Sequence, residues 1–284
     1  MNHDREPLPT RVDDLPALPA EAWQAFDAGL RALDLDDLPD SVRGALADHL
    51  RLLLAWNQSI NLTGVRSPSA ALREHLLDSL AAVHVLRRQH IHALLDLGSG
   101  GGFPGLPLAV AVPIRQALLV ESVAKKAAFL EAAARLASAD TVLAAGWPGG
   151  DGPGGDGPAI DVFAGRAETL AADPRHRQRW PAVVARAIAP LAELAELALP
   201  LVALGGILVA WKRHPLEAEL AAAEPAVARL GGHPATLVPV PVEGLEDHVL
   251  VIVEKVAPGP PGYPRDRARR RGRPIAPGDP LPSA

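Results

Sequence analysis

The 284-residue sequence contains no cysteine, and only 4% of its residues are aromatic. Without thiols the chain cannot form a disulfide framework, a thiolate metal site or a cysteine nucleophile, and we expect no metal. No apolar run approaches the roughly 18 residues of a membrane span, and the Pro-rich N-terminus lacks the apolar segment of a signal peptide. These absences favour a cytoplasmic enzyme without a membrane partner. Because 48% of the residues are hydrophobic, the chain can still bury a large core.

Positive charge is scarce and unevenly placed. The net charge is −5, and the chain has four lysines. Six arginines and one aspartate lie between Arg265 and Arg273, a local charge of +5, which leaves about −10 for the remainder. A basic segment on an acidic chain is typical of an arm that binds a polyanion, although a solvated tail without a partner has the same composition.

Composition and periodicity divide the chain into four parts. Residues 1–20 contain four prolines, and we expect them to be disordered. Apolar residues at helical spacing predict an N-terminal helical cap over 21–90, with helices at 22–38, 41–57 and 68–86. Residues 91–256 form the main domain, interrupted at 146–158 by a flexible Gly/Pro insertion. Residues 257–284 are a basic tail rich in proline and arginine.

The main domain alternates short apolar strands with helices. This alternation is typical of βαβ units and a parallel sheet. Two further strands, 236–242 and 248–254, flank Gly244 closely enough to form an antiparallel hairpin. The pattern therefore predicts an α/β, Rossmann-like class I methyltransferase fold, in which a mostly parallel seven-stranded sheet ends in an antiparallel hairpin.

A glycine-rich loop from Asp96 to Gly105 follows the first strand. Glycines at a strand end allow close backbone approach to a ligand, and the next helix offers free N–H groups. Gly100, Gly102 and Gly105 match the dinucleotide pattern G-x-G-x-x-G. The spacing of Gly98, Gly100 and Gly102 after Asp96 fits S-adenosylmethionine better, because this cofactor carries cationic groups and no pyrophosphate.

Residues after the second and third strands complete the expected cofactor site. Glu121 ends the second strand, with Ser122 beside it, where a carboxylate can accept both ribose hydroxyls. A carboxylate binds the ribose in the same way in NAD enzymes, so Glu121 is compatible with both S-adenosylmethionine and NAD. Ala167 and Glu168 follow the third strand at the position expected to hold adenine.

The fourth strand narrows the chemistry of methyl transfer. No Asn/Asp-Pro-Pro-Tyr segment follows it, and without cysteine the covalent route to pyrimidine C5 is closed. A nucleophile with its own lone pair, such as a purine N7, needs alignment rather than a general base. Arg186 could position a phosphate, a base edge or the cofactor, or could simply pair with an acid. No residue receives a certain catalytic role.

Several motifs along the chain occur together in one family. They are Asn57-Gln-Ser-Ile-Asn-Leu-Thr63, His75-Leu-Leu-Asp-Ser79, Leu95 to Gly105, Gly165-Arg-Ala-Glu168, Arg186-Ala187 and Tyr263-Pro-Arg265. On these motifs, over roughly residues 50 to 275, the chain resembles the RsmG (GidB) family of bacterial 16S rRNA guanine-N7 methyltransferases. The insertion at 146–158 departs from the shorter family pattern.

The resemblance implies a function and a set of site residues. The methyl donor would be S-adenosylmethionine, and the acceptor N7 of a guanosine in the 530 loop of 16S rRNA, on the 30S subunit or an assembly intermediate. Gly98, Phe103, Ala167, Glu168 and Arg186 would line the cofactor pocket. We expect a monomer. Candidate RNA contacts are Asn61, His75, Lys125, Lys126, Lys212, Arg213, Arg265, Arg269 and Arg270, of which Arg213 stands where the family more often has glycine.

Three other functions remain open from the sequence. The chain could methylate a small molecule or a protein, although the basic tail favours RNA. It could be an NAD oxidoreductase, but that reading requires a substrate domain that the C-terminal half does not offer. It could also be a non-catalytic RNA-binding protein that has kept the cofactor loop but lost methyltransferase activity.

Overall fold

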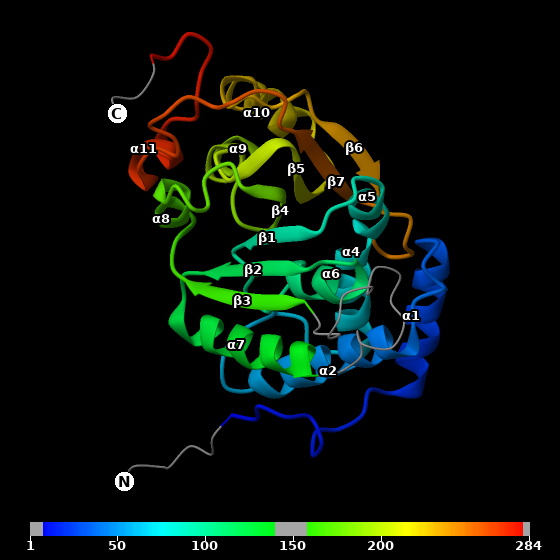
Figure 1. Cartoon of the computed structure of the whole chain (residues 1–284). Coiled ribbons are helices and arrows are strands. Elements are labelled where there is room, and N and C mark those ends of the chain that lie inside the picture. Colours follow the sequence, from blue (N-terminus) through cyan, green and yellow to red (C-terminus); the bar gives the residue numbers. More distant parts are fainter. Residues whose placement is uncertain (1–7, 140–157, 281–284) are drawn as a thin grey trace.

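The computed structural model describes residues 8–139 and 158–280, and its centre is a seven-stranded sheet between two layers of helices (Figure 1). The strand order is β3-β2-β1-β4-β5-β7-β6. The strands are β1 (Ala93–Leu97), β2 (Gln116–Glu121), β3 (Ala159–Ala164), β4 (Trp180–Arg186), β5 (Val202–Arg213), β6 (Thr236–Pro239) and β7 (His248–Glu254).

The pairing of these strands confirms the predicted fold class. The pairs β1–β2, β2–β3, β1–β4 and β4–β5 are parallel, whereas β7 is antiparallel to both β5 and β6. The predicted hairpin is therefore present at the end of the sheet, with β6 at the edge and β7 between β5 and β6. Because the parallel strands share one direction, their carboxyl ends meet at one edge of the sheet, where open α/β sheets bind ligands.

Alternate residues of each strand enter different cores, as the pleat of a strand requires. Leu94 and Leu119 face the core shared with the N-terminal helices. Leu95 and Leu118 face the core on the opposite side of the sheet. The first layer contains α1 (Ala20–Ala32), α2 (Asp40–Trp56), α3 (Pro68–Ala71), η1 (Leu72–Leu77), α4 (Asp78–Leu80), α5 (Val83–Arg88), α6 (Gly105–Ala111) and α7 (Ala124–Ala139), and the second α8 (Ala167–Ala172), α9 (Leu191–Ala198) and α10 (Glu217–Arg229).

The expectation that residues 1–20 are disordered remains a prediction, but residues 8–19 make defined contacts with α2 in the structure. Proline removes regular structure from this segment but leaves its carbonyl groups as acceptors. The Arg51 guanidinium of α2 donates to the carbonyls of Val12 at 2.8 Å and Pro16 at 3.0 Å, and Trp56 Nε1 donates to that of Pro9 at 2.6 Å. Side chains of α2 therefore replace the missing backbone pairing. Residues 1–7 lie outside the described part of the chain.

The predicted helix over 68–86 is broken into shorter pieces. Its middle, Leu72–Leu77, is a π-helix that separates α3 from α4, and α5 begins only at Val83. Such π segments occur often at functional sites. The first predicted helix is also shorter than expected. It ends at Ala32, and Asp34, two residues later, adopts a φ of 55° that cannot continue a right-handed helix.

The division into a cap and a main domain remains a prediction, and most of the proposed insertion at 146–158 lies outside the described residues. The described part of the tail has defined structure, including α11 (Arg267–Gly272). Within the described ranges, no helix has both the length and the apolar composition to cross a membrane.

Candidate active site

Two cavities lie at the carboxyl edge of the sheet, on either side of the segment that follows β4. Ile188 and Ala189 line the first cavity, and Arg186 and Ala187 line the second, so the four residues separate the two. The first has a volume of about 180 Å³, and the second about 440 Å³. The other main residues of the first are Gly98, Glu121, Ser122, Gly165 to Glu168, Glu193, Arg267 and Arg270; those of the second are Glu74, His75, Asp78, Trp211, Lys212, Arg213 and His248.

The glycine loop borders the first cavity through Gly98 and has a conformation that favours glycine. Gly98, Gly100 and Gly102 have φ angles of 67°, 55° and 88°, in the left-handed region that side chains disfavour. A Cβ on Gly98 would also lie 3.0 Å from Cγ1 of Ile188. The loop thus depends on glycine both for its backbone shape and for the space beside Ile188.

Asp96 accepts hydrogen bonds from residues of this loop and does not line the first cavity. Its Oδ2 accepts the Gly105 N–H at 3.0 Å, and its backbone carbonyl accepts the Ser99 hydroxyl at 3.1 Å. The carboxyl is fully buried, and Oδ1 has no hydrogen-bond partner among the described residues. Burial raises the pKa of Asp96 to about 7. Asp96 therefore fixes the start of α6, and its negative charge is disfavoured.

Glu121 joins the end of β2 to the loop. Its Oε2 accepts the Gly100 N–H at 3.1 Å, and its Oε1 accepts the Val123 N–H at 2.7 Å. Each carboxylate oxygen can accept one more hydrogen bond. The buried Glu121 is thus fixed by the backbone and keeps acceptor capacity toward the first cavity, which suits a ribose diol.

The remaining walls of the first cavity fit the rest of S-adenosylmethionine. Glu168 at the start of α8 and Glu193 on α9 add two carboxylates. Acidic groups favour a ligand that carries a sulfonium and an ammonium, and a carboxylate can accept the adenine amino group. Burial opposes ionisation of Glu168, but its own backbone N–H and the paired Arg270 outweigh that effect and lower its pKa.

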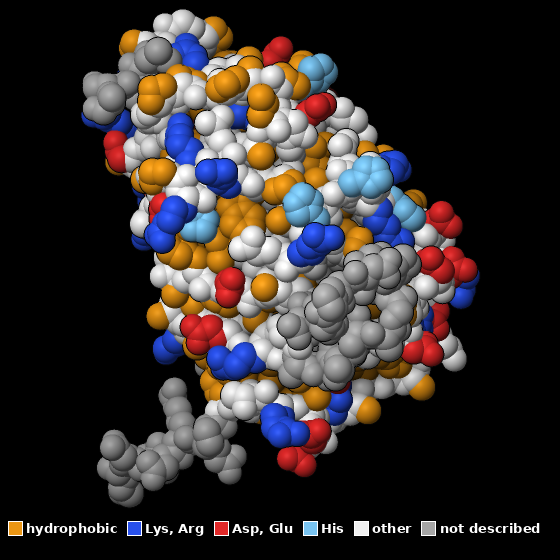
Figure 2. Space-filling view, in the orientation of Figure 1, with side chains coloured by type: hydrophobic (Ala, Val, Ile, Leu, Met, Phe, Trp, Pro, Cys, Tyr) orange, Lys and Arg blue, Asp and Glu red, His pale blue; other side chains and the backbone are white. Residues whose placement is uncertain are grey.

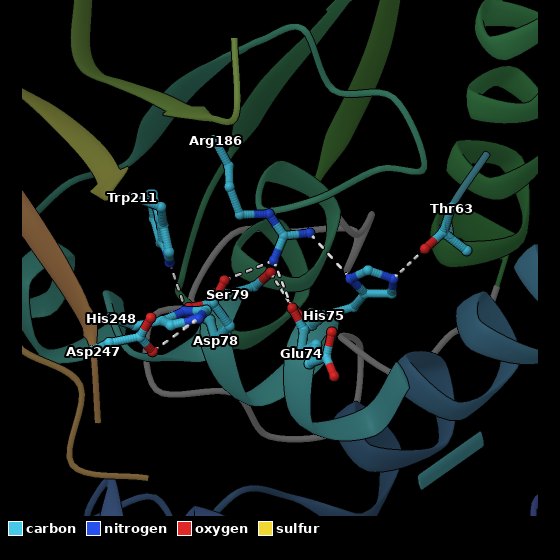
Figure 3. A network of polar contacts seen from close by, with 9 residues as sticks. All are labelled: Thr63, Glu74, His75, Asp78, Ser79, Arg186, Trp211, Asp247 and His248. Atoms are coloured by element: carbon cyan, nitrogen blue, oxygen red, sulfur yellow. Dashed lines mark hydrogen bonds and ion pairs between the residues drawn. The ribbon is translucent and has the colours of Figure 1, made fainter. Parts of the chain in front are cut away.

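A buried carboxylate organises the second cavity (Figure 3). The side chain of Asp78 is 2% exposed and has two basic partners. Arg186 Nη1 donates to Asp78 Oδ2 at 2.7 Å, and His248 Nδ1 donates to Oδ1 at 2.8 Å. The Trp211 indole N–H donates to the backbone carbonyl of Asp78 at 2.7 Å. Asp78, the first residue of α4, therefore orients side chains from β4, β5 and β7.

His75 connects this network to the helical cap and to the glycine loop. Its Nε2 lies 2.7 Å from Thr63 Oγ1, while Nδ1 faces Arg186 Nη2 at 3.4 Å. Burial, together with the positive charge of Arg186, lowers the pKa of His75 to about 4, so the ring is neutral near pH 7. Phe103 stacks on His75 with ring centroids 4.7 Å apart, and the Arg186 guanidinium lies 5.3 Å from the Phe103 centroid.

Comparison with known proteins identifies the family. The family model described as rRNA small subunit methyltransferase G (GidB) matches residues 43–144. Three proteins named ribosomal RNA small subunit methyltransferase G show the same similarity over most of their length. That of Roseiflexus sp. is 40% identical over 78% of this chain and 87% of its own, that of Chloroflexus aggregans 38% over 76% and 83%, and that of Dehalococcoides mccartyi 35% over 84% and 93%.

The chain belongs to this family. It is a methyltransferase, and S-adenosylmethionine is its methyl donor. The resemblance drawn from the sequence motifs is confirmed, and the oxidoreductase reading of Gly100, Gly102 and Gly105 is wrong.

The structure separates the residues that were predicted to bind the cofactor. Gly98, Glu121, Ser122, Ala167 and Glu168 come together around the first cavity. Asp96, Gly100 and Gly102 shape the loop without lining that cavity. Phe103 is buried in the ring stack, and Arg186 lines the second cavity instead of the first.

The residues predicted to bind RNA are also divided. His75, Lys212 and Arg213 line the second cavity, where Lys212 donates to the Ala189 carbonyl at 2.8 Å and pairs with Glu219. Asn61 and Lys125 are exposed and Lys126 is half-buried. Lysine and arginine side chains lie scattered among acidic and apolar groups on the face shown in Figure 2, with no single basic patch.

Two tail arginines do not fit the expectation of a free RNA-binding arm. Arg265 makes a two-pronged ion pair with the buried carboxylate of Glu196, and Arg270 is buried against Glu168. Their guanidinium groups satisfy carboxylates of the same chain, so they face inward. Arg269 has an exposed side chain.

Sequence reasoning missed four residues: Asp78, Glu193, Trp211 and His248. Asp78 lay within the recognised motif His75 to Ser79, which marked its importance without giving its partners. Trp211 and His248 lie at the end of β5 and the start of β7, and the antiparallel register of these strands brings them to Asp78. A strand-end survey that included the antiparallel strand would have found His248.

Substituting Gly98 by alanine tests the loop conformation. We expect Gly98→Ala to weaken binding of S-adenosylhomocysteine at least about tenfold, because the new methyl would lie 3.0 Å from Cγ1 of Ile188 and narrow the cavity there. Isothermal titration calorimetry measures the change. Gly205→Ala is the matched control, since Gly205 also has a positive φ of 77° but has no atom within 4 Å of its Cβ position. Equal affinity losses in both variants would contradict the prediction.

The raised pKa of Asp96 predicts a specific pH dependence of stability. Folded Asp96 titrates near 7, whereas in the unfolded chain it titrates at roughly 4. Between these values the folded state alone binds the proton, so its contribution to stability is lost as pH rises from 4 through 7. Relative to Asp96→Asn, the free energy of unfolding should fall by up to about 1.4 kcal/mol per pH unit in this window. Chemical denaturation at several pH values measures it.

The exposed Asp161 on β3 provides the control for that experiment, because Asp161→Asn also removes one carboxylate from the chain. Its difference from the unmodified chain should vary little between pH 4 and 7. A pH-independent difference for Asp96→Asn would show that Asp96 ionises normally in the folded protein.

Proposed function

We propose that the chain methylates N7 of a guanosine in the 530 loop of 16S rRNA. Its relatives are named for methylation of small-subunit ribosomal RNA. The observation that carries the proposal is a pair of neighbouring cavities lined by consecutive residues, Arg186 and Ala187 in one and Ile188 and Ala189 in the other. This arrangement provides one site for the methyl donor and a neighbouring site for an acceptor.

In this proposal the first cavity holds the methyl donor. Gly98 allows close approach of its backbone to the cofactor, Glu121 accepts the ribose hydroxyls, and Ala167 and Glu168 contact the adenine. The cofactor supplies an electrophilic methyl group on a sulfonium. The chain contributes binding and orientation, because a purine N7 already carries the lone pair that attacks.

The second cavity is the proposed site of the guanine. Arg186 offers guanidinium donors, which bind guanine O6 or a phosphate well. Trp211 adds an aromatic side chain beside it, and RNA bases are commonly recognised by stacking on such groups. The Asp78 carboxylate fixes Arg186, so the guanidinium need not lose rotational freedom when the base binds. Neutral His75 adds no positive charge to the cavity.

RNA outside the target base would be bound by weaker contacts. Asn61, Lys125, Lys126, Arg213 and Arg269 remain candidates. RNA is often recognised by shape and by unstacked bases, which suits the scattered basic side chains on the face shown in Figure 2. We propose that the enzyme acts in the cytoplasm as a monomer on the 30S subunit or an assembly intermediate.

Transfer of labelled methyl from S-adenosylmethionine to 30S subunits that lack their native modifications tests the proposed reaction. After transfer, the RNA is digested and its nucleosides are separated. We expect the label in 7-methylguanosine from the 530 loop. Label in another nucleoside, or transfer only to protein or to small molecules in an extract, would overturn the substrate assignment.

Substitution of Asp78 tests the role of the second cavity. Asp78→Asn keeps the shape of the side chain but removes the charge that holds Arg186. We expect kcat/KM for methyl transfer to RNA to fall by about 10- to 100-fold, the equivalent of about 1.4–2.8 kcal/mol of lost transition-state stabilisation. The affinity for S-adenosylhomocysteine should change less than about twofold. Single-turnover methyl transfer and calorimetry measure the two quantities.

Asp247→Asn is the matched control for this variant. Asp247 lies at the edge of the same network, 3.8 Å from His248 Nε2, and its side chain is 56% exposed. Exposed ion pairs contribute little, so this variant should retain nearly full methyl transfer. A loss of cofactor affinity in Asp78→Asn equal to its loss of activity would contradict the separation of the two cavities.

A further inference from the structure

The C-terminal segment is anchored to the second helical layer by ionic and apolar contacts. Arg265 donates to both oxygens of Glu196, at 2.9 Å and 2.7 Å, and its backbone N–H donates to Glu196 Oε1 at 2.7 Å. Tyr263 and Ile275, on either side of α11, are buried in the core formed by α8 to α10. These anchors hold α11 in place beside the first cavity.

The side chain of Arg270, on α11, forms part of the wall of that cavity. This side chain is 1% exposed, and Nη2 pairs with Oε1 of Glu168. Its Nη1 donates to the Arg265 carbonyl, so the helix and its first anchor are connected. Its Nε lies 3.8 Å from Glu193 Oε1 and has no hydrogen-bond partner among the described residues. The guanidinium therefore lies between two carboxylates that line the first cavity.

We infer that α11 forms part of the cofactor site and that Arg270 positions Glu168 to accept the adenine amino group. The inference rests on the proposed place of the cofactor in the first cavity. The arginine-rich tail then contributes to binding the adenosine part of the cofactor, and not only to binding RNA.

Electrostatics explains why the position of Glu168 depends on Arg270. Glu121, Glu168 and Glu193 line the same cavity. Arg166 also lowers the pKa of Glu168, but among the described ion pairs only Arg270 contacts its carboxylate directly. Carboxylates in one cavity repel, so without this contact the Glu168 side chain turns toward solvent. Arg270 neutralises this repulsion and occupies one oxygen of Glu168, Oε1. The second oxygen is then held in a fixed direction and can accept an N–H of adenine.

The test compares two ligands that differ by one amino group. They are S-adenosylhomocysteine and its analogue with an unsubstituted purine in place of adenine. The full unmodified chain should prefer the first ligand by about tenfold, the value of one hydrogen bond to a charged group. Arg270→Met should lower affinity for S-adenosylhomocysteine by about tenfold and change affinity for the analogue less than about twofold.

Arg269→Met is the matched control on the same helix. Arg269 has a 73% exposed side chain and pairs only with Asp266 among the described ion pairs. This variant removes the same charge and should retain both affinities and the preference for the amino group. Thermal unfolding of all proteins shows whether the fold is kept.

A second variant tests the same inference if Arg270→Met does not fold. Arg270→Lys keeps the buried positive charge but loses the fork that reaches Glu168, and it should also lose most of the preference for the amino group. Full preference in either folded variant, or an equal loss of affinity for both ligands, would overturn the inference. These measurements contain no RNA, so a failed rRNA assay with the expected ligand preference would overturn only the proposed substrate.

Discussion

The buried carboxylate of Asp78 is the constraint on which the second cavity depends. It is almost fully buried and pairs with Arg186 of β4 and His248 of β7. The backbone carbonyl of Asp78 accepts a hydrogen bond from the indole of a residue on a third strand, β5. Removing one partner of a buried ion pair costs about 3–5 kcal/mol, because the remaining charge is left unpaired. Asp78 belongs to the N-terminal helices, whereas its partners belong to the sheet. The carboxylate thus ties the helices to the edge of the sheet where the two cavities lie.

A ring stack couples the two cavities more directly. Phe103 extends from the glycine loop, and His49 and His75 pack against it with centroids 4.7 Å away. His49 Nε2 also donates to the Gly101 carbonyl at 2.8 Å, and burial lowers its pKa to about 4. Neutral rings can be packed at low cost, whereas charged imidazolium rings would oppose the nearby Arg186. The stack therefore keeps the donor loop and the Arg186 network in one fixed relation.

The residues visible from sequence are those whose role follows from local pattern. Glycines after an apolar strand and an acid at the next strand end predicted the first cavity, because parallel strands bring their carboxyl ends together. Asp78 and His248 are 170 residues apart, and only the register of an antiparallel strand unites them. The composition of the 68–86 segment does not predict its π-helix, since the leucines of Leu72–Leu77 have ordinary helical spacing. The partners of the arginine-rich tail could not be predicted for a similar reason, because Glu168 and Glu196, which bind it, lie far away in the sequence.

Pairing also determines how an acidic chain can act on RNA. Arg186, Arg265 and Arg270 each have a carboxylate partner in the same molecule, so part of the positive charge serves internal geometry. An arginine held by a buried acid contributes less to long-range attraction of phosphates, but its donors point in fixed directions. Such a site gains specificity from orientation rather than from charge. For a reaction in which the acceptor nitrogen needs no base, orientation is the main contribution that the protein can make.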